Sequence, residues 1–105
     1  MITQKGSLLI GIEYDGKIHK DFELRPQLVR DTVTAFEHPK FSNDMYAGLI
    51  LLSAQIIKLG DIPKEKITPE LLLDLYEEDV KILFSAKEEL ANKLKSFRSQ
   101  ENSIK

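Results

Sequence analysis

Two histidines are the first residues in this 105-residue chain that could bind a metal or move a proton. His19 lies in an alternating apolar and polar segment, and His38 precedes a proline. Neither has a second ligand at metal-binding spacing, because the chain contains no HExxH or HxH motif. Histidines in such segments mostly lie at the surface. We therefore expect two solvated histidines and no metal or cofactor site.

The acidic run Glu77-Glu78-Asp79 is the next candidate for catalysis. Two carboxylates perform acid/base chemistry when they occupy unlike environments. Here all three stand at the start of a predicted helix, where acidic side chains interact favourably with the helix dipole. The glycine motifs GxGxxG and GxSxG, which serve phosphate binding and nucleophilic catalysis, are absent. We therefore expect that the protein is not an enzyme.

Two arginines and an aspartate surround Pro26 in the segment HKDFELRPQLVRD. Arg30 and Asp31 are adjacent, so on a helix they diverge by about 100° and do not pair. Both fall on the predicted polar side, which argues against a catalytic pair. Arg25 lies at the joint between a strand and a helix, where it is free to reach carboxylates of later helices. We interpret all three as parts of a binding surface.

The elements that position these residues begin with two alternating segments. Residues 8–14 and 18–24 have the two-residue period of β-strands, and Asp15-Gly16 between them indicates a hairpin. A two-residue loop would set the apolar row of one strand beside the polar row of the other. We therefore expect a three-residue loop that includes Tyr14, with Gly16 in a left-handed conformation.

A first helix is predicted to begin at Pro26, whose fixed φ and missing N–H suit the first helical position. It ends before Pro39. Its apolar residues lie in one arc of about 140° and comprise Leu28, Val29, Thr32, Val33 and Phe36. In the loop that follows, Ser42 or Asn43 is suited to cap the next helix.

The second predicted helix spans about 44–59, ends at Gly60, and is apolar on nearly every side. Such a helix is either central in a fold or covered by a partner. Tyr46 and Ile50 are candidates for the partner contact. Its apolar run, 45–57, has 13 residues, whereas a membrane span needs about 20, so we expect no membrane insertion.

Thr68-Pro69-Glu70 has the residue types of a helix N-terminus, namely an N-cap, a first-turn proline and an early acid. A short helix over 69–75 is predicted to lead into a long one over about 76–97. The two are either continuous or bent near Leu75.

An apolar heptad seam in the long helix is interrupted only by Lys87. Its amine either lies at the solvent rim or pairs with a carboxylate of a neighbouring helix or subunit. Ile82, on the opposite side, either packs on residues 69–75 or is exposed. Together with the apolar second helix, these residues suggest self-association into a homo-oligomer, or partner binding, through the helical part.

The composition is that of one soluble domain, with 42% apolar residues, 30% charged residues and a net charge of −2. We assign residues 1–97 to this domain and 98–105 to a flexible C-terminal tail. Cysteine is absent, which excludes disulfides and fits a reducing cytoplasm. The basic segment KLKSFR, 93–98, supports one alternative, a small nucleic-acid-associated regulatory protein of a mobile element. The negative net charge weighs against nucleic-acid binding.

The order of these pieces resembles the small tail assembly chaperones of Mu-like and P2-like contractile-tailed phages and prophages. The resemblance covers about residues 8–97 and rests on Phe22-Glu23-Leu24-Arg25-Pro26, Val29-Arg30-Asp31 and Ile67-Thr68-Pro69-Glu70. In that family a strand that closes on Leu-Arg-Pro enters a helix, and later helices often begin with a Thr-Pro-Glu cap. The stretch 41–60 is more apolar than is usual in the family, which puts the details of partner contact in doubt.

The resemblance implies a non-enzymatic role during virion assembly in the cytoplasm of a bacterial host. It implies that the protein binds the tape measure protein, keeps the long hydrophobic helix of that protein soluble and helps to recruit tail tube subunits. The expected fold is α+β, with an N-terminal antiparallel β-hairpin followed by three or four helices. The candidate partner-binding residues are Arg25, Arg30, Asp31, Tyr46, Ile50, Ile82 and Lys87.

Overall fold

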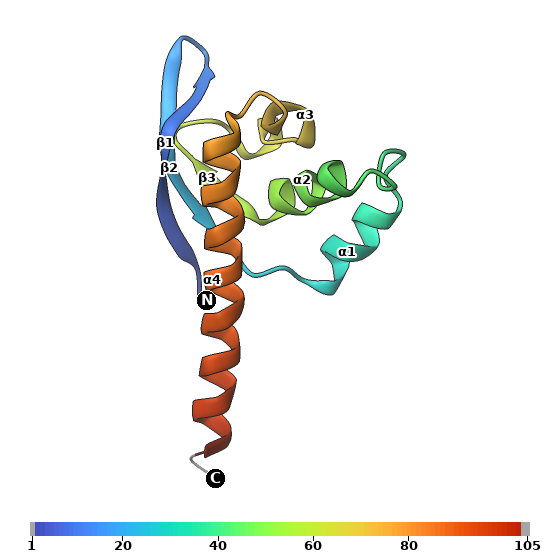
Figure 1. Cartoon of the computed structure of the whole chain (residues 1–105), viewed down its shortest axis with the longest axis vertical. Helices are drawn as coiled ribbons and strands as arrows, with labels where there is room; N and C mark the ends of the chain where they lie inside the picture. Colours follow the sequence, from blue (N-terminus) through green and yellow to red (C-terminus); the bar gives the residue numbers. More distant parts are fainter. Residues whose placement is uncertain (1, 104–105) are drawn as a thin grey trace.

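The computed structural model describes residues 2–103, with side chains described through Phe97. An N-terminal antiparallel hairpin is followed by helices, so the predicted α+β class is confirmed (Figure 1). The elements are β1 (Gln4–Tyr14), β2 (Lys17–Leu24), α1 (Val29–Phe36), α2 (Asp44–Gln55), β3 (Ile56–Leu59), the 3-10 turn η1 (Lys64–Lys66), α3 (Pro69–Leu72) and α4 (Glu77–Ser103).

The β1–β2 hairpin turns through two residues, so the predicted three-residue loop is wrong. Tyr14 pairs directly with Lys17 across the turn. Asp15 and Gly16 have φ angles of 53° and 75°. Two consecutive residues with positive φ form the type I′ turn, whose twist matches that of the two strands. The Asp-Gly dipeptide therefore determines the loop length here.

The mismatch of apolar rows that this short loop creates is resolved inside β1. The register shifts between Ser7 and Ile12, and Gly11 adopts a φ of 96° within this bulge. Beyond the bulge, Ile12 pairs with His19, and both side chains are buried. Ile18 instead points outward and is 58% exposed. The expectation of a solvated His19 is therefore wrong.

The buried imidazole of His19 joins the hairpin to the loop that follows β3. Its Nε2 lies 3.1 Å from the carbonyl oxygen of Tyr14, and its Nδ1 accepts the N–H of Asp61 at 3.1 Å. Because Nδ1 accepts, Nε2 is the ring nitrogen left to donate, and the imidazole bridges the hairpin and the loop.

Residues 56–59, predicted as the end of the second helix, form the third strand. β3 pairs antiparallel with β2, with Phe22 opposite Leu59 and Leu24 opposite Ile56. The sheet order is therefore β1-β2-β3. The adjacent β-branched residues Ile56 and Ile57 favour an extended backbone. Burial of Ile56 and Leu59 in the core then stabilises the strand.

Gly60 ends β3 in a left-handed conformation, with a φ of 55°. A Cβ at this position would overlap the imidazole of His19. We expect Gly60→Ala to lower the free energy of unfolding by about 2–4 kcal/mol, as the sum of backbone strain and overpacking. Urea unfolding followed by circular dichroism measures this. Gly16→Ala is the matched control, because Gly16 also has positive φ but has no atom within 4 Å of the added Cβ. An equal loss of unfolding free energy in the two variants would contradict the contribution assigned to the overlap with His19.

A lysine holds the C-terminus of α2 where the chain turns into β3. The ammonium of Lys64 donates to the carbonyl oxygens of Ser53 at 2.7 Å and Ile56 at 2.6 Å. The last carbonyls of a helix lack intrahelical partners, and a cation satisfies them well. Burial lowers the pKa of Lys64 from its ordinary value.

The main core lies where the sheet, α2, α3 and α4 meet, and α4 packs along β1 (Figure 1). Of the two alternatives for the apolar second helix, a central place in the fold or a covering partner, the structure shows the first. Six residues of α2 are buried. A second, smaller cluster between α1 and α2 contains Ala35, Tyr46 and Ile50. The buried residues of the main core are Leu8, Ile12, Phe22, Leu24, Leu49, Leu52, Ile56, Leu59, Ile62, Ile67, Leu72, Leu75, Leu83, Ala86 and Leu90.

The predicted helix caps are confirmed at two sites. Asn43 Oδ1 accepts the N–H of Tyr46 at 2.9 Å, and Thr68 Oγ1 accepts the N–H of Leu71 at 3.2 Å. Helix α3 ends at Leu72 and α4 begins at Glu77, so the two are separate helices.

Helix α4 continues to Ser103, so its predicted end at 97 is wrong. Of the tail predicted over 98–105, residues 104–105 lie outside the described residues, and the flexibility of this segment stays a prediction. The described chain measures 52 × 29 × 23 Å because the C-terminal half of α4 extends past the sheet (Figure 1).

Candidate functional site

Asp79, the last residue of the acidic run, is fully buried against the bulge of β1. Its carboxylate accepts the backbone N–H groups of Leu9 at 2.7 Å, Ile10 at 3.1 Å and Gly11 at 2.8 Å. These are the donors that the bulge leaves without a strand partner. The expected role of Asp79 at the helix dipole is therefore incomplete, because the carboxylate also joins α4 to β1. The sequence signal was Gly11, because a glycine inside a strand pattern often marks a bulge.

Arg25 and Asp31 form a bidentate ion pair, with N–O distances of 2.8 and 2.9 Å. The prediction that Arg25 reaches carboxylates of later helices is wrong. The same Asp31 carboxylate accepts the N–H of Leu28 at 2.8 Å, which explains why α1 begins at Val29 and not at Pro26. Asp31 is buried, so its predicted place on an exposed polar side is also wrong.

The charges of this pair stabilise each other. The hydrogen bond from Arg25 lowers the pKa of Asp31, against the opposing effect of burial. The hydrogen bond to Asp31 raises the pKa of Arg25. Both groups are therefore ionised and paired at neutral pH, and they lack the unlike protonation that acid/base catalysis requires.

Gln55 fixes the same joint to the end of α2. The N–H of Arg25 donates to the carbonyl oxygen of Gln55 at 2.9 Å, and the Gln55 side-chain amide donates to the carbonyl oxygen of Arg25 at 3.0 Å. Gln55 is 2% exposed. Sequence reasoning missed it, because a single glutamine in an apolar run shows no spacing pattern.

Two of the predicted partner-binding residues, Tyr46 and Ile50, are buried between α1 and α2. The Tyr46 hydroxyl donates to the carboxylate of Glu70, and this hydrogen bond raises the pKa of Tyr46. The ammonium of Lys40 lies 5.1 Å from the centre of the Tyr46 ring. In this conformation Tyr46 and Ile50 support the two helices and are not on the free surface.

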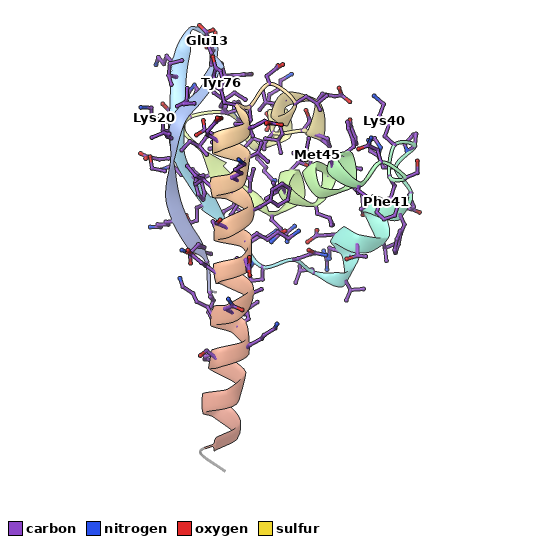
Figure 2. The ribbon with its side chains drawn as sticks, in the orientation of Figure 1. Glu13, Lys20, Lys40, Phe41, Met45 and Tyr76 are labelled. Atoms are coloured by element: carbon purple, nitrogen blue, oxygen red, sulfur yellow. The ribbon has the colours of Figure 1, made fainter. Side chains whose placement is uncertain are left out.

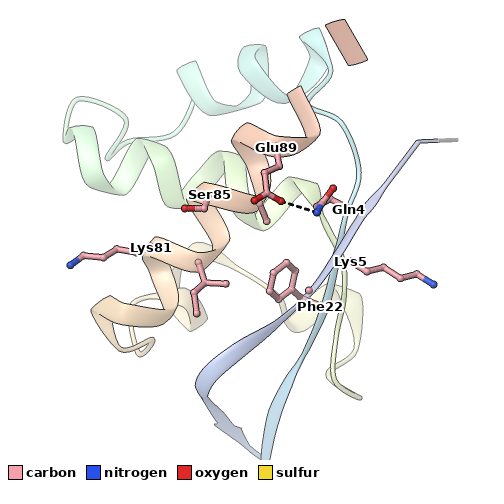
Figure 3. Close-up of a pocket in the computed structure, with 9 residues that line it drawn as sticks. Gln4, Lys5, Phe22, Lys81, Ser85 and Glu89 are labelled. Carbon is pink, nitrogen blue, oxygen red and sulfur yellow. Dashed lines mark hydrogen bonds between the residues drawn. The ribbon is translucent and has the colours of Figure 1, made fainter. Parts of the chain in front are cut away.

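Ile82 is half-buried and lines a hollow of about 280 Å³ between α4 and β1. Phe22 and Gln4 line the same hollow, and Gln4 donates to Glu89 at 3.0 Å (Figure 3). Ile82 also packs against the main core, which includes Leu72 and Leu75, so the alternative in which Ile82 is exposed is not what the structure shows.

Lys87 is half-buried on α4, and burial lowers the pKa of its amine. Within residues 2–97, whose side chains are described, no carboxylate lies within ion-pair distance of Lys87. Arg30 is exposed on α1. The structure therefore brings Arg25 and Asp31 together. The charge of Asp31 also acts on Lys87, where it opposes the effect of burial on the pKa of the amine.

An apolar groove runs between α2, α3 and the start of α4, with a volume of about 270 Å³. Met45 and Leu73 line this groove and are 56% and 52% exposed. Figure 2 shows Met45 on α2. Met45, Leu49 and Leu73 also line an adjoining hollow of about 430 Å³ beside the loop that precedes α2. We call the first hollow the α2–α3–α4 groove, and its apolar lining consists of Met45, Leu49, Leu72, Leu73, Leu75, Val80 and Phe84.

Other kinds of site have little support in the part of the chain that the structure describes. No cluster of three or more histidine, aspartate or glutamate residues there is placed to hold a metal ion. None of its helices is both long enough and apolar enough to cross a membrane. In the basic segment 93–98, Lys93 donates to the carbonyl oxygen of Thr3 at 3.3 Å.

The chain matches no protein-family model, no curated protein and no solved structure. The resemblance to tail assembly chaperones therefore stays a prediction, supported by the residues that carry it.

Proposed function

We propose that the protein is a non-enzymatic chaperone that binds an apolar helix of a partner protein in the α2–α3–α4 groove. The observation that carries this proposal is the exposed apolar edge of the groove, at Met45 and Leu73. Amphipathic helices bind in this way by burying apolar side chains in a groove between helices. Methionine suits such a site because its flexible side chain adapts to different partners.

The proposed partner is the tape measure protein of a phage or prophage, with tail tube subunits recruited later in the cytoplasm of the bacterial host. The resemblance over residues 8–97 supports this choice. A tape measure protein has a long hydrophobic helix that needs shielding from water before assembly, and an apolar groove supplies that shield.

Co-expression with a tape measure protein encoded next to this chain tests the proposal. We expect the fraction of soluble tape measure protein to rise in the presence of the chain, and the two proteins to copurify. A folded chain that leaves the tape measure protein insoluble would overturn the proposed function.

A variant at the edge of the groove tests the proposed surface. We expect Leu73→Lys to weaken binding about tenfold or more, because the complex loses the burial of one leucine side chain. Ile18→Lys is the matched control, since Ile18 is 58% exposed on the hairpin and does not line the groove. Isothermal titration with a peptide of the partner helix measures both. Equal weakening by the two substitutions would place the contact elsewhere.

A further inference from the structure

The apolar side of helix α1 faces solvent, and its polar and small residues face the rest of the protein. Its two buried residues are Asp31, which is ion-paired, and Ala35, which is small. Its large apolar side chains face outward instead, with exposures of 46% for Leu28, 81% for Val29, 52% for Val33 and 63% for Phe36. The amphipathic pattern that normally faces a core faces solvent here.

The polar anchors of α1 hold it in this orientation. The pair of Arg25 and Asp31 fixes its first turn, and Ala35 packs against α2 in the smaller cluster. At its other end, Phe36 contacts the ring of Phe41 edge to face, with ring centres 4.6 Å apart. A rotation that buried the apolar stripe within the monomer would break the buried ion pair, which costs about 3–5 kcal/mol.

Two opposite charges border the stripe on one side only. At about 100° per residue, Arg30 and Glu37 lie about 20° apart around the helix axis and about 10 Å apart along it. Arg30 is near the start of α1 and Glu37 is its C-cap residue, and both are exposed. Among the described side chains, neither residue has an ion-pair partner.

This arrangement is self-complementary. When two copies of a helix pack antiparallel about a two-fold axis, the same flank of each copy faces the other. Arg30 of one copy then lies opposite Glu37 of the other, and the contact occurs twice because the interface is isologous. Val33 lies close to the two-fold axis, since it is near the midpoint between the two charges.

We propose that α1 is the interface of a homodimer, in which the stripe of Leu28, Val29, Val33 and Phe36 packs antiparallel on the same stripe of a second copy. The charge pattern selects a second copy over an unrelated helix, because one flank supplies both halves of each ion pair. One short helix gives a smaller interface than the roughly 800 Å² per partner that is usual in stable complexes. The dimer is therefore dependent on protein concentration.

Sedimentation velocity of the full chain from about 1 μM to 1 mM tests the proposal, a range chosen because small interfaces bind weakly. We expect a monomer–dimer equilibrium. We expect Val33→Asp to weaken the dimer about a hundredfold, because it buries two like charges beside the axis. Because Val33 is half-exposed in the monomer, we expect Val33→Asp to fold. Circular dichroism and the thermal midpoint, compared with those of the wild type, check this. A monomer throughout the range, or a dimer that Val33→Asp does not change, would overturn the proposal.

A charge exchange tests the antiparallel geometry. We expect Arg30→Glu and Glu37→Arg each to weaken the dimer about tenfold, because each replaces two attractive contacts by two repulsive ones. The double variant restores both pairs and is expected to dimerise like the wild type. Failure of the double variant to recover would overturn the antiparallel arrangement.

The dimer and the proposed chaperone function are tested separately. Leu73→Lys, at the groove, is expected to leave the monomer–dimer equilibrium unchanged. A dimer that Leu73→Lys disrupts would place the interface in the groove and overturn the assignment to α1. The tape measure co-expression result does not bear on this outcome.

Discussion

Replacement of Asp79 by alanine is expected to lower the free energy of unfolding by about 3–6 kcal/mol. The carboxylate accepts three backbone N–H groups of the β1 bulge, and its removal leaves those donors without partners, with the Gly11 N–H buried and the other two partly buried. Each unsatisfied buried donor costs about 1–3 kcal/mol. Because a domain of this size is stable by about 5–15 kcal/mol, the loss is a large share of the total. We expect the thermal midpoint to fall by about 15–30 °C.

The neighbouring acid supplies the control for this experiment. Glu78 lies in the same first turn of α4 but is exposed. Glu78→Ala should lower the free energy of unfolding by less than about 1 kcal/mol, which is the size of a helix-dipole interaction. Asp79→Asn should fall between the two, since its amide keeps one acceptor oxygen. If chemical denaturation gave Asp79→Ala and Glu78→Ala the same midpoint, the bulge contact would have no energetic importance.

The second large effect is expected at the pair of Arg25 and Asp31. Arg25→Met should cost about 3–5 kcal/mol, because it leaves the Asp31 carboxylate buried with a single N–H donor. Asp31→Leu should cost a similar amount, since it removes the ion pair and the acceptor for Leu28. The double variant removes both charges together and should be more stable than the sum of the single losses predicts, by about 1–3 kcal/mol.

Urea unfolding of the four proteins at pH 7 measures this double-mutant cycle. The double variant is not expected to regain the full stability of the wild type. The Leu28 N–H still lacks its acceptor, which costs about 1 kcal/mol. Exposed Arg30, five residues further along the chain from Arg25, offers a control: Arg30→Met removes the same charge type outside the pair. A coupling energy near zero would mean that the two side chains stabilise the joint independently.

The pair also predicts a pH dependence whose sign follows from the lowered pKa of Asp31. In the unfolded chain this carboxyl titrates near its ordinary value, about 3.9. Between that value and the lower pKa of the folded state, the unfolded chain binds more protons, so stability falls with falling pH. The contribution is complete above about pH 5 and is lost as the pH falls through the folded pKa. Wild-type protein should therefore lose stability on acidification more steeply than the Arg25→Met/Asp31→Leu variant.

Local rules predicted those parts of the fold that depend on neighbouring residues. The two caps at Asn43 and Thr68 were predicted correctly, because each depends on residues within one turn. The strand at 56–59 was missed because a short apolar run after a helix fits both periods, and only pairing with β2 distinguishes them. The predicted start of the first helix, at Pro26, lies too early in the chain, because proline suits a helical N-terminus but does not require one.

The candidate site was less predictable, because burial is a property of the whole fold. His19 alternates with polar residues and was assigned to the surface, but the bulge at Gly11 moves its partner Ile12 to the same buried side. The sequence correctly predicts that the apolar side chains of α1 lie on one side of the helix. Periodicity groups its side chains on one face, but it does not determine whether that face meets the core or solvent.

The bond from Asp79 also affects how the protein avoids aggregation. β1 is an edge strand of the sheet, and edge strands with free N–H groups can recruit strands of other molecules. A bulge distorts this edge, and the carboxylate of α4 occupies three donors of the bulge. An incoming strand would meet an irregular edge with few free donors. Loss of Asp79 is therefore expected to open this edge to pairing with strands of other molecules.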